Sequence, residues 1–90
     1  MDIASATTLF EALASQKRLL ILRLLLKGEV AVGDLMEPVG LSQSALSQHL
    51  AILRAARLVD TRRERQNIYY ACRSEVVRAV LAAAGLEEAP

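Results

Sequence analysis

Side chains able to do redox or metal chemistry are scarce in this 90-residue chain, which has one cysteine and one histidine. A zinc site needs three or four ligands, so Cys72 and His49 alone do not make one. Asp34 and Glu37 lie three residues apart on one predicted helix face, and a metal site shared through them by two subunits is the less favoured alternative. The sequence therefore predicts no metal and no other cofactor.

Cys72 has a plain structural interpretation. Alternation along a predicted strand places it on the same side as Ile68 and Tyr70, facing the core, where a free cysteine behaves as a small buried hydrophobe. A thiol sensor at Cys72 is the alternative, but the chain has no second cysteine that could resolve an oxidised sulfur.

Motifs for catalysis are missing from the sequence. It has no glycine-rich phosphate loop, no serine, histidine and acid at a plausible spacing, and no paired carboxylates facing a cleft. The serines at 42, 44 and 47 resemble a nucleophile cluster, but helix capping and the exposed face of one predicted helix account for them. We expect a binding protein and not an enzyme.

One predicted helix, from Gln43 to about Ala56, has an uncharged polar face at its N-terminal end. When its leucines point inward, the opposite face carries short amide and hydroxyl groups, with no charge from residue 42 to residue 51. Glutamine pairs bidentately with adenine in the major groove, and serine can donate or accept. The residues expected to read base edges are Gln43, Ser44, Ser47, Gln48 and His49. Ordinary solvent exposure is the alternative, and for His49 so are packing, a phosphate contact or a role as a pH switch.

Arginines cluster after that helix, where a hairpin is predicted with strands at 59–63 and 68–72 and a turn at 64–67. Long cations at its tip could reach phosphates or the adjacent minor groove; the alternative is that they only keep the hairpin edge soluble. The residues expected on the DNA backbone are Ser42, Arg54, Arg62, Arg63, Arg65 and Gln66. Lys17 and Arg18, in an earlier helix, are weaker candidates.

The elements that must position these side chains are mostly helices. Apolar spacing predicts helices at Ile3–Ala14, Gln16 to about Leu26, Val32–Glu37 (stopped by Pro38), and Glu75 to about Ala84. The short third helix, the turn around Gly40 and the longer helix after it follow one another as in a helix-turn-helix. The predicted fold is mainly α with a small β-hairpin: a winged helix-turn-helix of order ααααββα, in one domain over residues 1–90. The last helix is apolar over so much of its circumference that one side can face the core while the other needs a partner.

Charge and composition agree with this interpretation. Residues 42–73 hold six arginines against two acids, a net charge of +4, whereas the remainder of the chain is −3. The chain is 53% hydrophobic with three aromatic residues, which predicts a folded protein with few platforms for stacking unpaired bases. The N-terminus lacks the basic residues of a secretory signal, and the longest apolar run, 19–26, is too short to span a bilayer. We expect a cytoplasmic protein without a membrane partner.

The segments LSQSALSQHLAILRAARLV and TRRERQNIYYAC resemble the ArsR/SmtB family of bacterial winged-helix regulators, and the resemblance extends from about Leu9 to Leu86. The first segment is most similar to the branch of thiol-based sulfur and redox sensors. The resemblance implies a homodimer joined through the first and last helices, with recognition helices in successive major grooves. It also implies repression of a neighbouring operon that a metal or thiol signal relieves. The residues this places at a dimer interface are Ile3, Leu9, Phe10, Val76, Val80, Leu81 and Ala84.

The chain departs from the family pattern at the positions that sense inducers. Metal sensors often carry Glu-Leu-Cys-Val-Cys-Asp-Leu where residues 29–35 here read EVAVGDL, and residues 75–86 contain neither Asp nor His. The sulfur-sensing branch has a cysteine where this chain has Arg23 and another near residues 85–89, where there is none. Relatives also commonly have glycine at Arg57; in a left-handed conformation arginine costs about 1 kcal/mol, and there it could bring another cation near DNA.

The leading hypothesis is therefore a homodimeric, sequence-specific repressor that binds double-stranded DNA at an inverted repeat, with half-sites about 10 base pairs or a multiple apart. Its inducer is unknown. A winged-helix interaction module without DNA readout is the alternative, and a DNA binder with no small-molecule input is an intermediate possibility.

Overall fold

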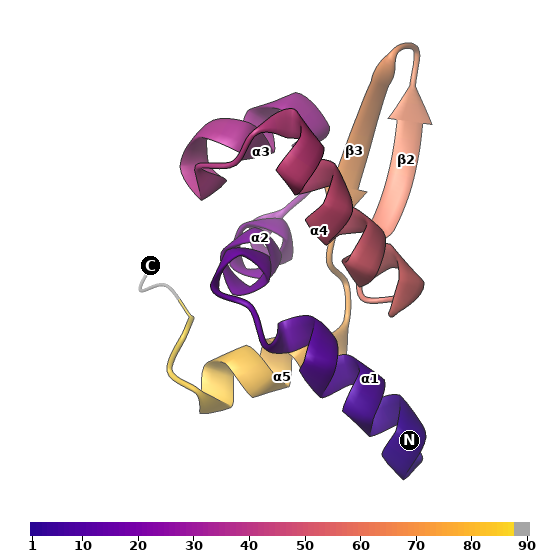
Figure 1. The fold of residues 1–90 in the computed structure, drawn as a ribbon, viewed down its shortest axis with the longest axis vertical. Helices are drawn as coiled ribbons and strands as arrows, with labels where there is room; N and C mark the ends of the chain where they lie inside the picture. Colours follow the sequence, from indigo (N-terminus) through magenta and orange to yellow (C-terminus); the bar gives the residue numbers. More distant parts are fainter. Residues whose placement is uncertain (88–90) are drawn as a thin grey trace.

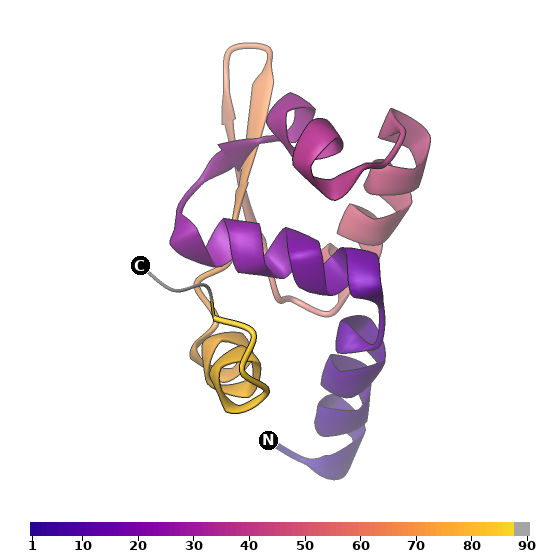
Figure 2. The same cartoon turned by 90° about the vertical axis from the view of Figure 1, so that its left-hand side faces the viewer.

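Eight elements make up the structure, a computed structural model that describes residues 1–87. In chain order they are α1 (Ile3–Leu13), α2 (Gln16–Lys27), β1 (Val30–Ala31), α3 (Val32–Val39), α4 (Gln43–Ala55), β2 (Asp60–Glu64), β3 (Asn67–Ala71) and α5 (Glu75–Ala83). Helix α2 runs through the middle; α1 and α5 lie at one end, and α3, α4 and the hairpin at the other (Figures 1 and 2). The predicted fold class, a winged helix-turn-helix, is confirmed.

The core forms around α2 because its apolar residues recur on more than one side. Ile21, Leu22 and Leu25 are almost completely buried. Around them pack the leucine stripe of α4, which is Leu46, Leu50 and Leu53, and the inner residues of α5. The leucines of α4 thus point inward as predicted, which leaves the opposite face of that helix outside.

The hairpin belongs to a three-stranded antiparallel sheet of order β1-β3-β2. The sequence did not predict β1, whose Val30 and Ala31 pair with Tyr70 and Tyr69. The predicted strand limits were also displaced by one residue: Glu64 pairs with Asn67, so the turn has only two residues. Strand β1 fixes the base of the hairpin, or wing, to the helical body, and the tip projects away from it (Figure 1).

The prediction that Pro38 ends the third helix at Glu37 was wrong, because α3 continues to Val39. Proline has no N–H and interrupts the hydrogen bond to the carbonyl four residues earlier. Since Pro38 lies in the last turn of α3, the helix loses one bond there and then ends in any case at Gly40, whose φ is 72°.

Three helices end in the same way, with a residue in the left-handed conformation. After α3 and α5 this residue is Gly40 and Gly85, but after α4 it is Arg57, with φ 60°. The Arg57 N–H donates to the carbonyl of Arg54 (2.9 Å), and the Leu58 N–H to that of Leu53 (3.0 Å). These two bonds form a Schellman motif, and they hold a backbone conformation that disfavours any residue with a Cβ.

Replacing Arg57 with glycine should stabilise the protein. Glycine removes the strain of the left-handed conformation, but it also gives the unfolded chain more conformational freedom. The net effect should raise the free energy of unfolding by about 0.5–1 kcal/mol. Thermal melting followed by circular dichroism measures this. The matched control is Ala56→Gly, because Ala56 is in the right-handed conformation (φ −81°) and glycine there should lower the melting temperature. A lower melting temperature for Arg57→Gly would contradict the strain at this position.

Candidate nucleic-acid interface

Four polar side chains at the N-terminal end of α4 lie together on the surface. Gln43, Ser44, Ser47 and Gln48 are all exposed, whereas Leu46 and Leu50 on the opposite side of the helix are buried. Ser42 begins the helix: its Oγ accepts the Ala45 N–H at 3.2 Å. The structure thus brings together four of the five residues predicted to read bases, on an edge free of charged groups.

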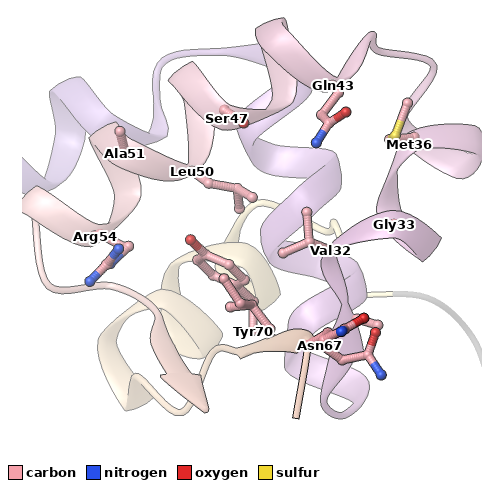
Figure 3. A pocket seen from close by; sticks show the side chains of 13 residues that line it. Val32, Gly33, Met36, Gln43, Ser47, Leu50, Ala51, Arg54, Asn67 and Tyr70 are labelled. Carbon is pink, nitrogen blue, oxygen red and sulfur yellow. The ribbon is translucent and has the colours of Figure 1, made fainter. Parts of the chain in front are cut away.

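A groove of about 520 Å³ separates this face of α4 from the wing. Gln43, Ser47 and Arg54 line one side of it, as Figure 3 shows, while Asn67 and Tyr70 of β3 lie on the other. The start of α3, near Val32, closes one end (Figure 3). None of the described residues that line the groove is acidic. A polyanion beside α4 would therefore meet an arginine and several hydrogen-bond donors and no repelling carboxylate in the groove.

His49, the fifth predicted base reader, lies apart from the other four. It is half-buried, and its Nδ1 is 3.2 Å from Nη1 of Arg18. A guanidinium has no acceptor, so Arg18 donates and Nδ1 of His49 accepts. Arg18 also donates to the carbonyls of Ala12 and Glu11, and Lys17 donates to that of Val39 at 2.7 Å. The cations that we named as weaker DNA candidates are thus engaged within the chain.

The arginines of the wing divide into two kinds. Arg62 donates from Nε and Nη2 to both carboxylate oxygens of Glu29 (3.0 and 2.8 Å) and from Nη1 to Glu64 (2.8 Å). Its guanidinium lies 4.6 Å from the ring centroid of Tyr69. The hydrogen bond from Arg62 lowers the pKa of Glu29, and the same carboxylate, with Glu64, raises the pKa of Arg62. Arg62 therefore binds the wing to the residue before β1 and is not a free cation.

Other predicted backbone contacts remain exposed to solvent. Arg63 points to the opposite side of β2 from Arg62 because side chains alternate along a strand. Arg65 and Gln66 form the tip, and Arg65 has φ 57°. Within residues 1–87, no carboxylate pairs with Arg54, Arg63 or Arg65. Arg54 lines the groove beside the polar face of α4, and Arg63 lies opposite Ile68, another lining residue, in the hairpin.

A second surface combines exposed apolar residues of α1 and α5, which lie at the same end of the molecule (Figure 2). Ile3 is 87% exposed, Phe10 57% and Val76 42%. Ala84 is exposed and Val80 half-buried. Leu9 and Leu81, which we also predicted at a dimer interface, instead belong to the core of the single chain, because both turn inward and are only 5% and 1% exposed.

Cys72 is buried, as predicted, although it lies one residue beyond β3. Its N–H donates to the carbonyl of Leu25 at 3.2 Å, and its side chain is part of the core. Burial raises the pKa of the Cys72 thiol, because the thiolate is poorly solvated there.

The raised pKa predicts a loss of stability at alkaline pH. The folded protein favours the neutral thiol and the unfolded chain ionises more readily, so stability is complete below the ordinary thiol pKa, about 8.5, and falls above it by up to about 1.4 kcal/mol per pH unit. Urea unfolding from pH 7 to 10 measures this. The control is Cys72→Ala, which should lack this part of the decline; equal slopes for the two proteins would contradict it.

The thiolate motif that metal sensors of the family carry at the start of α3 is absent from this chain. Ala31 and Gly33 stand at the two thiolate positions, and neither residue has a ligating side chain. Within residues 1–87, no three His, Cys, Asp or Glu side chains lie close enough to hold a metal ion together.

No helix in that range is both long and apolar enough to cross a membrane.

The fold and this surface define a winged helix-turn-helix DNA-binding protein, in which α3 and α4 form the helix-turn-helix and β2 and β3 the wing. Residues 15–61 match the family described as "Bacterial regulatory protein, arsR family". The chain belongs to that family of transcriptional regulators.

Relatives of known name agree with this assignment. The nodulation protein NolR of Rhizobium meliloti is 55% identical over 82 residues, which are 91% of this chain and 67% of that protein. The transcriptional activator HlyU of Vibrio cholerae is 49% identical over 87% of this chain and 72% of its own length. The crystal structure of NolR from Sinorhizobium fredii superposes with a TM-score of 0.87 at 54% identity, covering 91% of this chain and 82% of that one. The chain is thus a DNA-binding transcriptional regulator.

Proposed function

We propose that the protein is a single-domain, homodimeric repressor that binds an inverted-repeat operator with one α4 helix in each half-site. The observation that carries the proposal is the exposed, uncharged face of α4 beside a groove whose described lining contains Arg54 and no acidic residue. Gln43, Ser44, Ser47 and Gln48 read base edges. The backbone contacts come from Ser42, Arg54, Arg63, Arg65 and Gln66, which position the helix and make binding sensitive to salt.

Arg62 has an indirect part in this proposal. Because Glu29 and Glu64 neutralise it, its contribution to DNA binding is to hold the wing at a fixed angle to β1. A phosphate contact by Arg62 would require it to exchange a carboxylate for the DNA backbone. Arg63 and Arg65 need no such exchange.

Dimerisation accounts for the exposed apolar residues of α1 and α5. Three large hydrophobic side chains on these two helices are between 42% and 87% exposed: Ile3, Phe10 and Val76. A second copy of the chain would cover them, and its two-fold symmetry would match an inverted repeat.

The proposal includes no catalytic step and no metal. The residues at the family's sensor positions are Ala31, Gly33 and Arg23. None of them is a cysteine, so we propose that neither metal binding nor thiol oxidation at these positions releases the protein from DNA. A bacterial regulator meets its operator in the cytoplasm, which is where we place the protein.

The test is footprinting of the purified protein on fragmented DNA from its source genome, followed by gel shift on the sites found. We expect protected inverted repeats with centres about 10 base pairs or a multiple apart. Repression predicts that these sites overlap promoters whose transcription rises when the gene is deleted. No shift at low salt with any fragment would overturn the proposal and would favour an interaction module.

A further inference from the structure

The side chain of Arg18 connects α1 to the recognition helix. Its Nε donates to the carbonyl of Ala12 at 2.6 Å and its Nη2 to that of Glu11 at 3.2 Å, while Nη1 contacts His49 Nδ1 at 3.2 Å. Ala12 and Glu11 are in the last turn of α1, where carbonyls lack the N–H four residues further on. The Glu11 carbonyl also accepts the N–H of Ala14 at 3.3 Å. Arg18 is in the first turn of α2, and Figure 2 shows α1 and α4 on opposite sides of the N-terminal end of that helix. The guanidinium of Arg18 thus makes hydrogen bonds to both α1 and α4.

The first helix is attached to the body only at its C-terminal end. Its buried residues, Leu9, Ala12 and Leu13, all lie in its second half, whereas residues 3–8 are exposed or half-buried. A helix of this length extends about 16 Å. A small rotation at the end that Arg18 holds would therefore displace the far end, which carries the exposed Ile3, by several times as much.

The contact also restricts His49. The guanidinium is planar, so its two hydrogen bonds to α1 carbonyls fix the direction in which its third donor points. Because a guanidinium has no acceptor, Nδ1 of His49 must be the acceptor and carries no hydrogen. The ring then carries its hydrogen on Nε2. Held in this way and half-buried, His49 does not share the outer edge of α4 with Gln43, Ser44, Ser47 and Gln48.

We propose that Arg18 and His49 are positioning residues that fix the angle between α1 and α4 and thereby set the half-site spacing of the operator. The inference rests on the proposed function, in which α1 forms part of the dimer interface. If the interface fixes α1, the angle from α1 to α4 decides where the two recognition helices lie relative to each other. The polar link between these two helices runs through the guanidinium of Arg18 in α2, which donates to two α1 carbonyls and to His49 of α4.

The experiment uses synthetic operators with constant half-sites and a spacer changed one base pair at a time, with dissociation constants from fluorescence anisotropy. His49→Leu keeps an apolar group of similar size but removes the acceptor. His49→Asn is the matched variant, because its Oδ1 can take the place of Nδ1 and accept from Arg18. The wild type and His49→Asn should lose about tenfold in affinity or more when the spacer changes by one base pair. For His49→Leu we expect that dependence to fall to about threefold or its optimum to shift, with base preference inside the half-sites unchanged.

Arg18→Lys is a second, independent variant, since an ammonium group lacks the fork that serves both α1 and His49. It should flatten the spacer dependence in the same way, and it tests the proposal if His49→Leu does not fold. A spacer dependence as steep as that of the wild type in a folded variant would overturn the inference and leave the proposed function intact. So would a changed base preference at one operator position in both His49 variants, which would make His49 a base reader. If the wild type binds none of the operators, the proposed function itself fails.

Discussion

Replacing Gln48 with alanine should relax the base preference of the protein at one position in each half-site. A bidentate amide contact discriminates against the wrong base by about 1–3 kcal/mol, so the preference at that position should fall by about 5- to 150-fold. Because Gln48 is neutral and contacts no phosphate in this arrangement, the salt dependence of binding should stay the same. Anisotropy titrations against an operator and its single-base variants, at salt concentrations from 50 to 200 mM, measure both quantities.

Arg63→Ala separates the two kinds of contact. It should weaken binding to every sequence and, by removing one phosphate contact per subunit, reduce the slope of log affinity against log salt by about 1.8 in a dimer. The control arginine is Arg73, which is also exposed but lies after β3, at the far end of the hairpin from the tip, beside Asp60. Alanine there should change the slope less. Unchanged base preference in Gln48→Ala, together with an unchanged slope in Arg63→Ala, would contradict these roles.

The parts of the fold that the sequence predicted are those determined locally. Ser15, Ser42 and Ser74 each accept a backbone N–H three residues further on, so the starts of α2, α4 and α5 follow from side chains next to them. The leucine stripe of α4 repeats with the helix period and therefore fixed which face is buried. For the same reason the exposed polar face could be predicted residue by residue.

Contacts between distant segments account for what the sequence did not predict. Strand β1 is two residues long and exists because β3 pairs with it, and no periodicity marks so short a segment. Arg62 and Arg63 are neighbouring arginines on the same predicted strand, and the sequence gives no reason to separate them. In the structure Glu29, 33 residues away, pairs with Arg62. Leu9 and Leu81 were predicted at a dimer interface but are buried in the core of the single chain. The rotation of α1 and α5 against the core depends on packing, which the sequence alone does not determine. His49 meets Arg18 across 31 residues, which separates it from the base readers beside it in the chain.

The dimer prediction has the largest expected effect. Phe10→Asp should place a carboxylate in the middle of the proposed α1–α5 interface, where an unpaired charge is costly to bury. Because Phe10 is 57% exposed in the single chain, the variant should still fold. We expect a monomer by analytical ultracentrifugation, and an affinity for the full operator lower by about 10²- to 10⁴-fold, since the second half-site no longer benefits from a linked subunit. Affinity for an isolated half-site should be nearly unchanged, which distinguishes loss of the dimer from damage to α4.

Thr8→Asp is the matched control for this substitution. Thr8 is exposed on the same helix, and two residues before Phe10 the helical repeat places it on another side of α1, away from Ile3 and Phe10. It adds the same charge at nearly the same distance from DNA, so a general electrostatic effect would appear in both variants, whereas a broken interface would appear only in Phe10→Asp. If Phe10→Asp remains a dimer with the operator affinity of the control, the subunits do not associate through this end of the molecule. The symmetry that links two α4 helices to an inverted repeat would then have to come from another surface.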